Sequence, residues 1–251
     1  MRSLLAAFVF YTILPIPPSV PLNFERVARW LPLVGLTIGA LLASVDWLLH
    51  WLVPNEIRSV LVVCLWVGIT AGLHVDGAMD TADGLAAGDR TSAGLQRRLA
   101  AMTDSYSGAF GVMAAILLLL LKYVALLHLP EPRWMVLLLV PAWGRWGQLL
   151  AIALYPYLKE RGKGRFLKDT TRLPQDLWPS TLLLVIAFVA LRQLAAPTFP
   201  FPLWMAASAA IALASGAWLY RQLGGHTGDT YGAVVEWTEA IALVAATSAL
   251  P

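Results

Sequence analysis

Three aspartates dominate the chemistry that this sequence can perform. Asp76, Asp80 and Asp83 lie in the segment GLHVDGAMDTADGLAAG, residues 72–88, directly after an apolar run. Each residue turns a helix by about 100°, so the i, i+4, i+7 spacing places all three carboxylates on one narrow stripe. Like charges on one stripe repel each other and are costly to desolvate near lipid, so they require a cation among them. Hard oxygen ligands suit Mg²⁺ or Mn²⁺, and the pattern therefore predicts a metal-dependent enzyme of phosphate chemistry.

A solvated helix that happens to be acidic is the simpler interpretation of this segment. The residues between the aspartates are almost all small or apolar, whereas a solvated helix would carry Lys and Glu there. The composition therefore favours metal binding. His74, two residues before the first aspartate, is a candidate phosphate ligand, general base or partner of a metal ligand, and a structural hydrogen bond is an equal alternative.

The overall composition indicates a membrane protein. Of 251 residues, 59% are hydrophobic and 13% are charged, against about 25% charged in soluble domains. We expect an all-α, polytopic helical bundle that forms a single membrane-embedded catalytic domain over residues 1–251. The net charge of +3 is not gathered into a stripe, which argues against nucleic acid as a partner. A single cysteine, Cys64, excludes a disulfide framework within the chain.

Seven apolar runs are long enough to cross the hydrocarbon core, which takes roughly 17–25 residues. They lie near 33–53, 58–74, 108–128, 134–156, 178–196, 203–222 and 232–250. Residues 1–14 form a possible eighth span, or a short re-entrant or interfacial helix. We expect about seven transmembrane helices.

The distribution of Lys and Arg predicts the orientation of these spans. Twelve basic residues lie in the segments 15–32, 75–107, 157–177 and 221–231, whereas the opposite connections carry only Arg58 and Arg133. The basic segments are predicted to be cytoplasmic. The acidic segment then lies at the cytoplasmic boundary of the membrane.

A second polar constellation follows residue 223. The sequence GGHTGDT supplies candidate anion-binding or metal-binding residues at Gly225, Thr227, Gly228 and Asp229. Backbone N–H groups in such a loop can face an anion, although most glycine-rich loops are only turns.

Two further acids stand inside the apolar run after this loop. Glu236 and Glu239 would be expensive there without a partner, so Glu236 is a candidate metal ligand. The alternative is a salt bridge to Arg145 or Arg221. Arg145, itself in mid-run, must pair with an acid or bind a ligand phosphate.

Two other segments carry weaker signals. Asp104, in MTDSYSGAFG (residues 102–111), is a candidate catalytic residue, and a helix N-cap explains it equally well. The basic segment 157–172 is ordinary cytoplasmic charge by default, and its glycines and charge density also suit a phosphate-bearing substrate.

The motifs together resemble the cobalamin synthase family, the adenosylcobinamide-GDP ribazoletransferases. Five matches occur in order: Phe10–Pro17, Pro32–Ala40, GLHVDGAMDTADGL at 72–85, Met102–Gly111 and Gly224–Ala233. The chain departs from the commonest family pattern at Ile13, Tyr106 and His226.

The resemblance implies an activity, a cofactor and a location. Adenosylcobinamide-GDP and α-ribazole, or its 5′-phosphate, would be joined into adenosylcobalamin or its 5′-phosphate with release of GMP, the last step of nucleotide-loop assembly. The family requires Mg²⁺ and resides in the bacterial inner membrane, surrounded by lipid, and a homo-oligomer is compatible with it. Asp76, Asp80 and Asp83 would hold Mg²⁺ against the diphosphate. Asp104 or Asp229 would complete a second metal site, and a carboxylate or His74 would accept the hydroxyl proton.

Two other classes of protein also place acids near a membrane. CDP-alcohol phosphotransferases show a D-x2-D-G-x2-A-R…G-x3-D-x3-D pattern, whereas the spacing here is D-x3-D-x2-D with no Ala-Arg. Ion-coupled transporters usually place such acids near the bilayer midplane in repeated, broken helices. The acids here cluster at one edge and the sequence contains no repeat, so both alternatives are less favoured.

Overall fold

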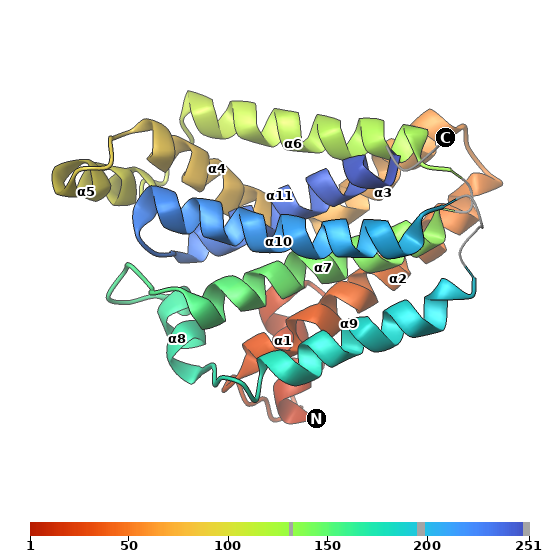
Figure 1. Cartoon of the computed structure of the whole chain (residues 1–251), viewed down its shortest axis with the longest axis horizontal. Coiled ribbons are helices and arrows are strands. Elements are labelled where there is room, and N and C mark those ends of the chain that lie inside the picture. Colours follow the sequence, from red (N-terminus) through yellow and green to blue (C-terminus); the bar gives the residue numbers. More distant parts are fainter. Residues whose placement is uncertain (131–132, 195–198, 248–251) are drawn as a thin grey trace.

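The computed structural model describes residues 1–130, 133–194 and 199–247. The helices are α1 (Arg2–Tyr11), the 3-10 turn η1 (Val27–Trp30), α2 (Leu31–His50), α3 (Asn55–Ile69), α4 (Leu73–Ala86), α5 (Ser92–Ala101), α6 (Ala109–His128), α7 (Trp134–Leu154), α8 (Lys163–Thr170), α9 (Leu177–Arg192), α10 (Phe201–Leu223) and α11 (Gly228–Thr247). Within the described ranges the only β-type pairing is one isolated bridge between Tyr157 and His226. The predicted all-α membrane bundle is confirmed (Figure 1).

Four helices are long and apolar enough to cross a membrane. They are α2 with its preceding turn, α6, α7 and α10, and the bent pair α3–α4 adds a fifth if it counts as one span. Six of the seven predicted apolar runs correspond to one helix each, with residues 195–196 and 248–250 outside the described ranges, whereas the run 58–74 extends from α3 across a break into α4. By length and composition alone, the count of seven spans is not confirmed: α9 has only 16 residues, and Asp229, Glu236 and Glu239 lower the hydropathy of α11. Helix α1, at ten residues, is also shorter than the roughly 20 that a span needs.

The chain breaks sharply between α3 and α4. Ala71 and Gly72 adopt left-handed backbone conformations, with φ of 51° and 72°, and the two helices meet at 85°. The N–H of Ile13, just after α1, donates to the carbonyl oxygen of Ile69 at the end of α3. The predicted run 58–74 is therefore not one straight helix, and the turn directs the acidic helix α4 away from the axis of α3.

Helix α11 occupies the centre of the bundle. It packs against α4, α6, α7 and α10, and most of its side chains are buried. Helices α2 and α7 pack most closely where small residues allow it: a Cβ on Gly39 would lie 2.2 Å from the carbonyl oxygen of Leu138. This central position brings the first turn of α11 against α4.

The two ends of the bundle carry different segments (Figure 1). The C-terminal ends of α2, α6 and α9 lie at the right of the view, together with the C-terminus. Helices α5 and α8 and the turn between α10 and α11 lie at the left. Three of the four basic segments, 75–107, 157–177 and 221–231, therefore lie at the end of the bundle to which the C-terminal end of α4 points.

Candidate active site

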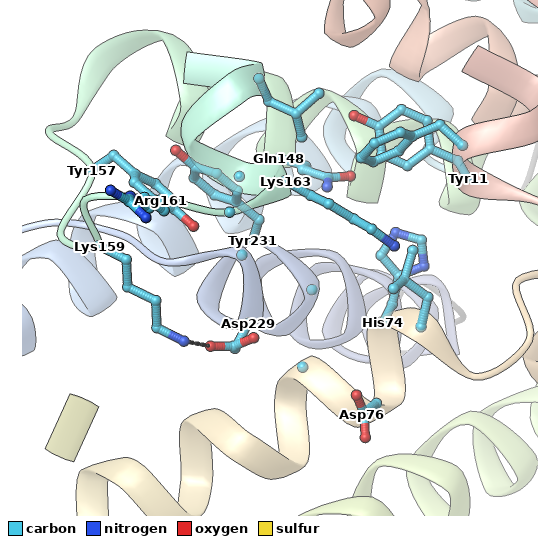
Figure 2. Close-up of a pocket in the computed structure, with 18 residues that line it drawn as sticks. Tyr11, His74, Asp76, Gln148, Tyr157, Lys159, Arg161, Lys163, Asp229 and Tyr231 are labelled. Carbon is cyan, nitrogen blue, oxygen red and sulfur yellow. Dashed lines mark hydrogen bonds and ion pairs between the residues drawn. The ribbon is translucent and has the colours of Figure 1, made fainter. Parts of the chain in front are cut away.

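A pocket of about 400 Å³ lies where α1, α4, α7, α8 and α11 converge (Figure 2). Its lining includes Asp76 from α4 and Asp229 from α11, together with three basic residues of the segment 157–164. Acidic and basic groups that are far apart in the sequence thus face one space.

The first turns of α4 and α11 approach each other almost backbone to backbone. A Cβ on Gly77 would lie 2.7 Å from the carbonyl oxygen of Asp229, and a Cβ on Gly232 would lie 3.0 Å from that of His74. Glycine is therefore required at position 77, and at position 232 a larger residue would fit only if the helices moved apart by a few tenths of an ångström. The contact sets Asp76 and Asp229 on either side of the helix crossing.

Asp80 is the centre of the acidic group. It lies half-buried on α4, and the carboxylates of Asp76, Asp229 and Asp83 and the ammonium of Lys159 all act on it electrostatically. Four carboxylates against one ammonium leave an excess of negative charge. Hard oxygen donors with excess negative charge fit a divalent cation such as Mg²⁺. No three of these acids, nor any other three His, Cys, Asp or Glu side chains of the described residues, stand close enough together to form a ready-made metal cage.

Three cations line the opposite side of the pocket. Lys159 donates to Asp229 at 2.9 Å, with both side chains about a quarter exposed. Arg161 and Lys163 make no ion pair within the described part of the chain, and Figure 2 shows Lys163 extending in the direction of His74. Burial raises the pKa of the nearby Tyr157 hydroxyl, so this group stays protonated and able to donate a hydrogen bond. The basic segment thus supplies charges suited to phosphate oxygens.

The glycine-rich loop divides into a structural half and a half that reaches the pocket. Thr227 caps α11: its hydroxyl accepts from the N–H of Thr230 at 3.2 Å, and its own N–H donates to the Thr230 hydroxyl at 2.8 Å. Gly225 is buried, and a Cβ there would lie 2.7 Å from the carbonyl oxygen of Pro156. Only Gly228 and Asp229 line the pocket. The structure therefore assigns Gly225 and Thr227 to holding the loop rather than to binding a ligand.

Asp83 and Asp104 take structural positions. The two carboxylate oxygens of Asp83 accept the N–H groups of Gly108 and Gly111, each at 2.8 Å, and so cap the start of α6. Asp104 is exposed and accepts the N–H of Tyr106 at 3.1 Å. Neither lines the pocket. Of the three aspartates on the predicted stripe, only Asp76 lines the pocket, whereas Asp80 lies one turn further along α4 and Asp83 points to the start of α6.

Glu236 and Arg145 belong to a buried ion network instead of the pocket. Lys122 of α6 donates to Glu236 at 2.8 Å and to Glu239 at 2.6 Å, and Arg145 pairs with Glu239. All four side chains are at most 5% exposed. The structure thus corrects two predictions. Glu236 is neutralised by Lys122 and is not placed as a metal ligand, and Arg145 pairs with an acid, so a ligand phosphate is not its partner.

Three pocket residues were not predicted from the sequence: Tyr11, Gln148 and Tyr231. Tyr11 and Gln148 stand in largely apolar runs and Tyr231 follows the glycine-rich loop, and an aromatic or amide side chain carries no signal of its own in either place. Lys122 was also missed, although a lone lysine within LLLLLKYVALL is a detectable signal, because an intramembrane charge requires a partner.

Comparison with known proteins identifies the family. The family model for cobalamin-5-phosphate synthase matches residues 3–247. The adenosylcobinamide-GDP ribazoletransferase of Trichormus variabilis is 50% identical over 246 residues, which cover 97% of this chain and 95% of the relative. That of Synechococcus elongatus is 49% identical over 243 residues, covering 96% and 94%. That of Prochlorococcus marinus strain MIT 9313 is 36% identical over 261 aligned positions, covering 100% and 97%.

No solved structure matches this chain. The family match and these relatives extend over nearly all of the sequence, including every segment that builds the pocket. The chain belongs to the cobalamin-5-phosphate synthase family.

Proposed function

We propose that this protein joins adenosylcobinamide-GDP to α-ribazole, or to its 5′-phosphate, and releases GMP. The ribose hydroxyl of ribazole would attack the cobinamide-side phosphorus, forming one P–O bond while the P–O bond to GMP breaks. One observation carries the proposal: a single pocket joins Asp76 and Asp229 with Lys159, Arg161 and Lys163. That combination suits a diphosphate that must be both neutralised and held in position.

The basic side chains would bind the diphosphate oxygens. Arg161 and Lys163 make no ion pair among the described residues, so their full charge is available to a ligand. Lys159 would exchange its contact with Asp229 for a phosphate oxygen when the substrate binds. The two glycines beside Lys163, Gly162 and Gly164, line the same pocket, and Gly164 allows the Tyr157 ring to pack against the backbone there, since a Cβ would lie 2.6 Å from that ring.

Asp76, Asp80 and Asp229 would hold a magnesium ion. A bound Mg²⁺ would neutralise the charge that develops on the departing GMP. The carboxylates of Asp76 and Asp229 repel that of Asp80 near the crossing of α4 and α11, and this repulsion supports the need for a cation that would draw the three acids together. The base that accepts the hydroxyl proton would be a free carboxylate of this group or His74, which lines the same pocket.

The reaction would take place at the cytoplasmic face of the bacterial inner membrane. The basic segments α5 and α8 and the turn before α11 gather at one end of the bundle, which agrees with the positive-inside rule (Figure 1). A Lys163→Cys variant, with Cys64→Ser to remove the native thiol, tests this orientation. An impermeant maleimide should label it only after the membrane is opened, and labelling from outside intact cells would reverse the proposed topology.

A turnover assay tests the activity directly. Purified full-length protein in detergent is incubated with adenosylcobinamide-GDP, α-ribazole and Mg²⁺, and GMP and the corrinoid product are separated by chromatography. We expect equimolar GMP and product, loss of both with a chelator, and recovery when Mg²⁺ is restored. Unchanged turnover in excess chelator would remove the metal from the proposal, and the absence of GMP release under all conditions would refute the activity.

A further inference from the structure

The most deeply buried polar side chains of the pocket lining are tyrosine, glutamine and histidine. Tyr11 of α1, His74 of α4, Gln148 of α7 and Tyr231 of α11 all line the pocket, and each is at most 4% exposed (Figure 2). We call these four residues the pocket floor. They come from four different helices, so only the assembled bundle brings them together.

The pocket floor carries polar atoms that lack hydrogen-bond partners within the described residues. These atoms are the hydroxyl oxygens of Tyr11 and Tyr231, Oε1 of Gln148 and both ring nitrogens of His74. The side chains of His74 and Gln148 interact with each other, and those of Tyr11 and Tyr231 interact electrostatically, but none of these five atoms has a partner that meets both the distance and the angle of a hydrogen bond. Buried polar groups in native proteins almost always have a partner, so several unpartnered atoms facing one space indicate a ligand.

The chemistry of the floor differs from that of the outer pocket. Lys159, Arg161, Lys163, Asp76 and Asp229 carry the charge of the pocket, whereas the floor offers hydroxyl, amide and imidazole groups. Such groups match a ligand that is polar but uncharged.

Aromatic rings complete the floor. The Tyr11 ring lies 4.7 Å from that of Phe10, and the Tyr231 ring lies 5.9 Å from that of Tyr157, measured between centroids. All four rings belong to residues that line the pocket. Flat faces beside hydrogen-bonding groups suit a planar heterocycle attached to a sugar.

The geometry points to the pocket floor as a nucleoside subsite, in which the hydroxyls, the amide and the imidazole bind ribose or base and the rings pack against the heterocycle. This inference rests on the proposed function, because both proposed substrates carry such a group: α-ribazole is a nucleoside, and the donor carries guanosine. A nucleoside bound at the pocket floor would lie beside the charged side chains of the pocket, because Asp76 lines the same space. A ribose hydroxyl held at the pocket floor and a phosphorus held by the charged side chains would thus be brought together.

Binding of the two free nucleosides tests the subsite without turnover. Full-length protein in detergent is titrated calorimetrically with α-ribazole and, separately, with guanosine. Tyr11→Phe and Tyr231→Phe each remove one hydroxyl without changing shape, and Gln148→Met removes the amide. Tyr220→Phe is the matched control, because Tyr220 is 39% exposed on α10 and does not line the pocket.

We expect each floor variant to weaken the binding of one of the two nucleosides about fivefold to tenfold, which is the usual effect of losing one hydrogen bond. The melting temperature of the ligand-free Tyr11→Phe and Tyr231→Phe variants should stay the same or rise, because each removes a hydroxyl that has no partner to lose. A purely structural role would instead lower the melting temperature and leave binding unchanged. The nucleoside whose binding is weakened identifies which substrate occupies the pocket floor.

Two results would overturn the inference: neither nucleoside binds the wild-type protein, or the floor variants bind both as tightly as the Tyr220→Phe control. These results are distinct from a failure of the proposed activity. That failure appears as absent GMP release by the wild-type protein, whatever the nucleosides do.

Discussion

Gly77 of α4 lies against the backbone of Asp229 of α11 with no space for a methyl group. A Cβ at position 77 would stand 2.7 Å from the Asp229 carbonyl oxygen and 3.2 Å from its Cα, both backbone atoms that no rotamer change can move. This contact is what places the acids of two distant segments at one crossing.

Gly77→Ala should therefore separate the two helices and lower kcat/KM by at least about 100-fold, because misplacement of about 1 Å costs that much in catalysis. Gly68→Ala on α3 is the matched control, since a Cβ there meets nothing within 4 Å. GMP release by the two purified variants makes the comparison. Equal activity of both would show that the crossing tolerates a side chain.

Asp80→Asn should abolish GMP release while the protein still inserts in the membrane. Loss of one carboxylate removes a proposed ligand and part of the charge that attracts the cation, an effect of several kcal/mol on the transition state. The control is Asp169→Asn, an exposed acid of α8 whose ion pair within the described residues is with Arg165. Near-normal turnover of Asp80→Asn at saturating Mg²⁺ would contradict the assignment.

Asp83 should behave differently from Asp80, because its two oxygens cap α6. Asp83→Ala should lower the free energy of unfolding by about 1–2 kcal/mol, the usual loss for an N-cap, whereas Asp83→Asn keeps one acceptor and should lose less. Thermal melts in detergent measure this. If both variants kept the wild-type melting temperature but lost all activity, Asp83 would be a ligand after all.

The buried network predicts that two substitutions are better tolerated than one. Lys122→Met leaves Glu236 without its cation and should destabilise the protein by about 3–5 kcal/mol. Adding Glu236→Gln restores the balance of one cation, Arg145, with one anion, Glu239, and should recover part of the loss. Denaturant unfolding of the single and double variants tests the coupling, and strictly additive losses would argue against it.

His226 predicts a pH dependence of stability. It is fully buried, its ring contacts the Thr230 hydroxyl at 3.0 Å and the Gly216 carbonyl oxygen at 3.2 Å, and burial lowers its pKa to about 4. Because the unfolded chain takes up the proton first, near pH 6.5, this histidine contributes stability above that pH and loses it as the pH falls towards 4.

The loss should amount to at most about 3 kcal/mol for the shift of about 2.5 units. Melting temperatures of the wild type and of His226→Gln, measured between pH 7.5 and pH 4.5, should diverge as the pH falls. Parallel curves for the two proteins would show that His226 does not titrate in this range.

The sequence was sufficient to identify the acidic helix and the glycine-rich loop, because both patterns are local. It could not show that Asp83 would point to α6, since the register between two helices depends on packing that no spacing reveals. Likewise, Glu236 and Asp229 stand on one helix and look alike in the sequence. Only the packing of α6 against α11 places Lys122 beside Glu236, whereas Asp229 remains in the pocket. Tyr11 and Gln148 were out of reach because burial against a distant helix gives them their role.

The central position of α11 has a consequence for how the protein assembles in the membrane. Lys122 and Arg145 are synthesised before Glu236 and Glu239, so they are without counter-ions until α11 inserts between α6 and α7. The same insertion brings Asp229 against α4. Assembly of the ion network and assembly of the candidate site are therefore one event, because without α11 neither the counter-ions of Lys122 and Arg145 nor Asp229 is in place.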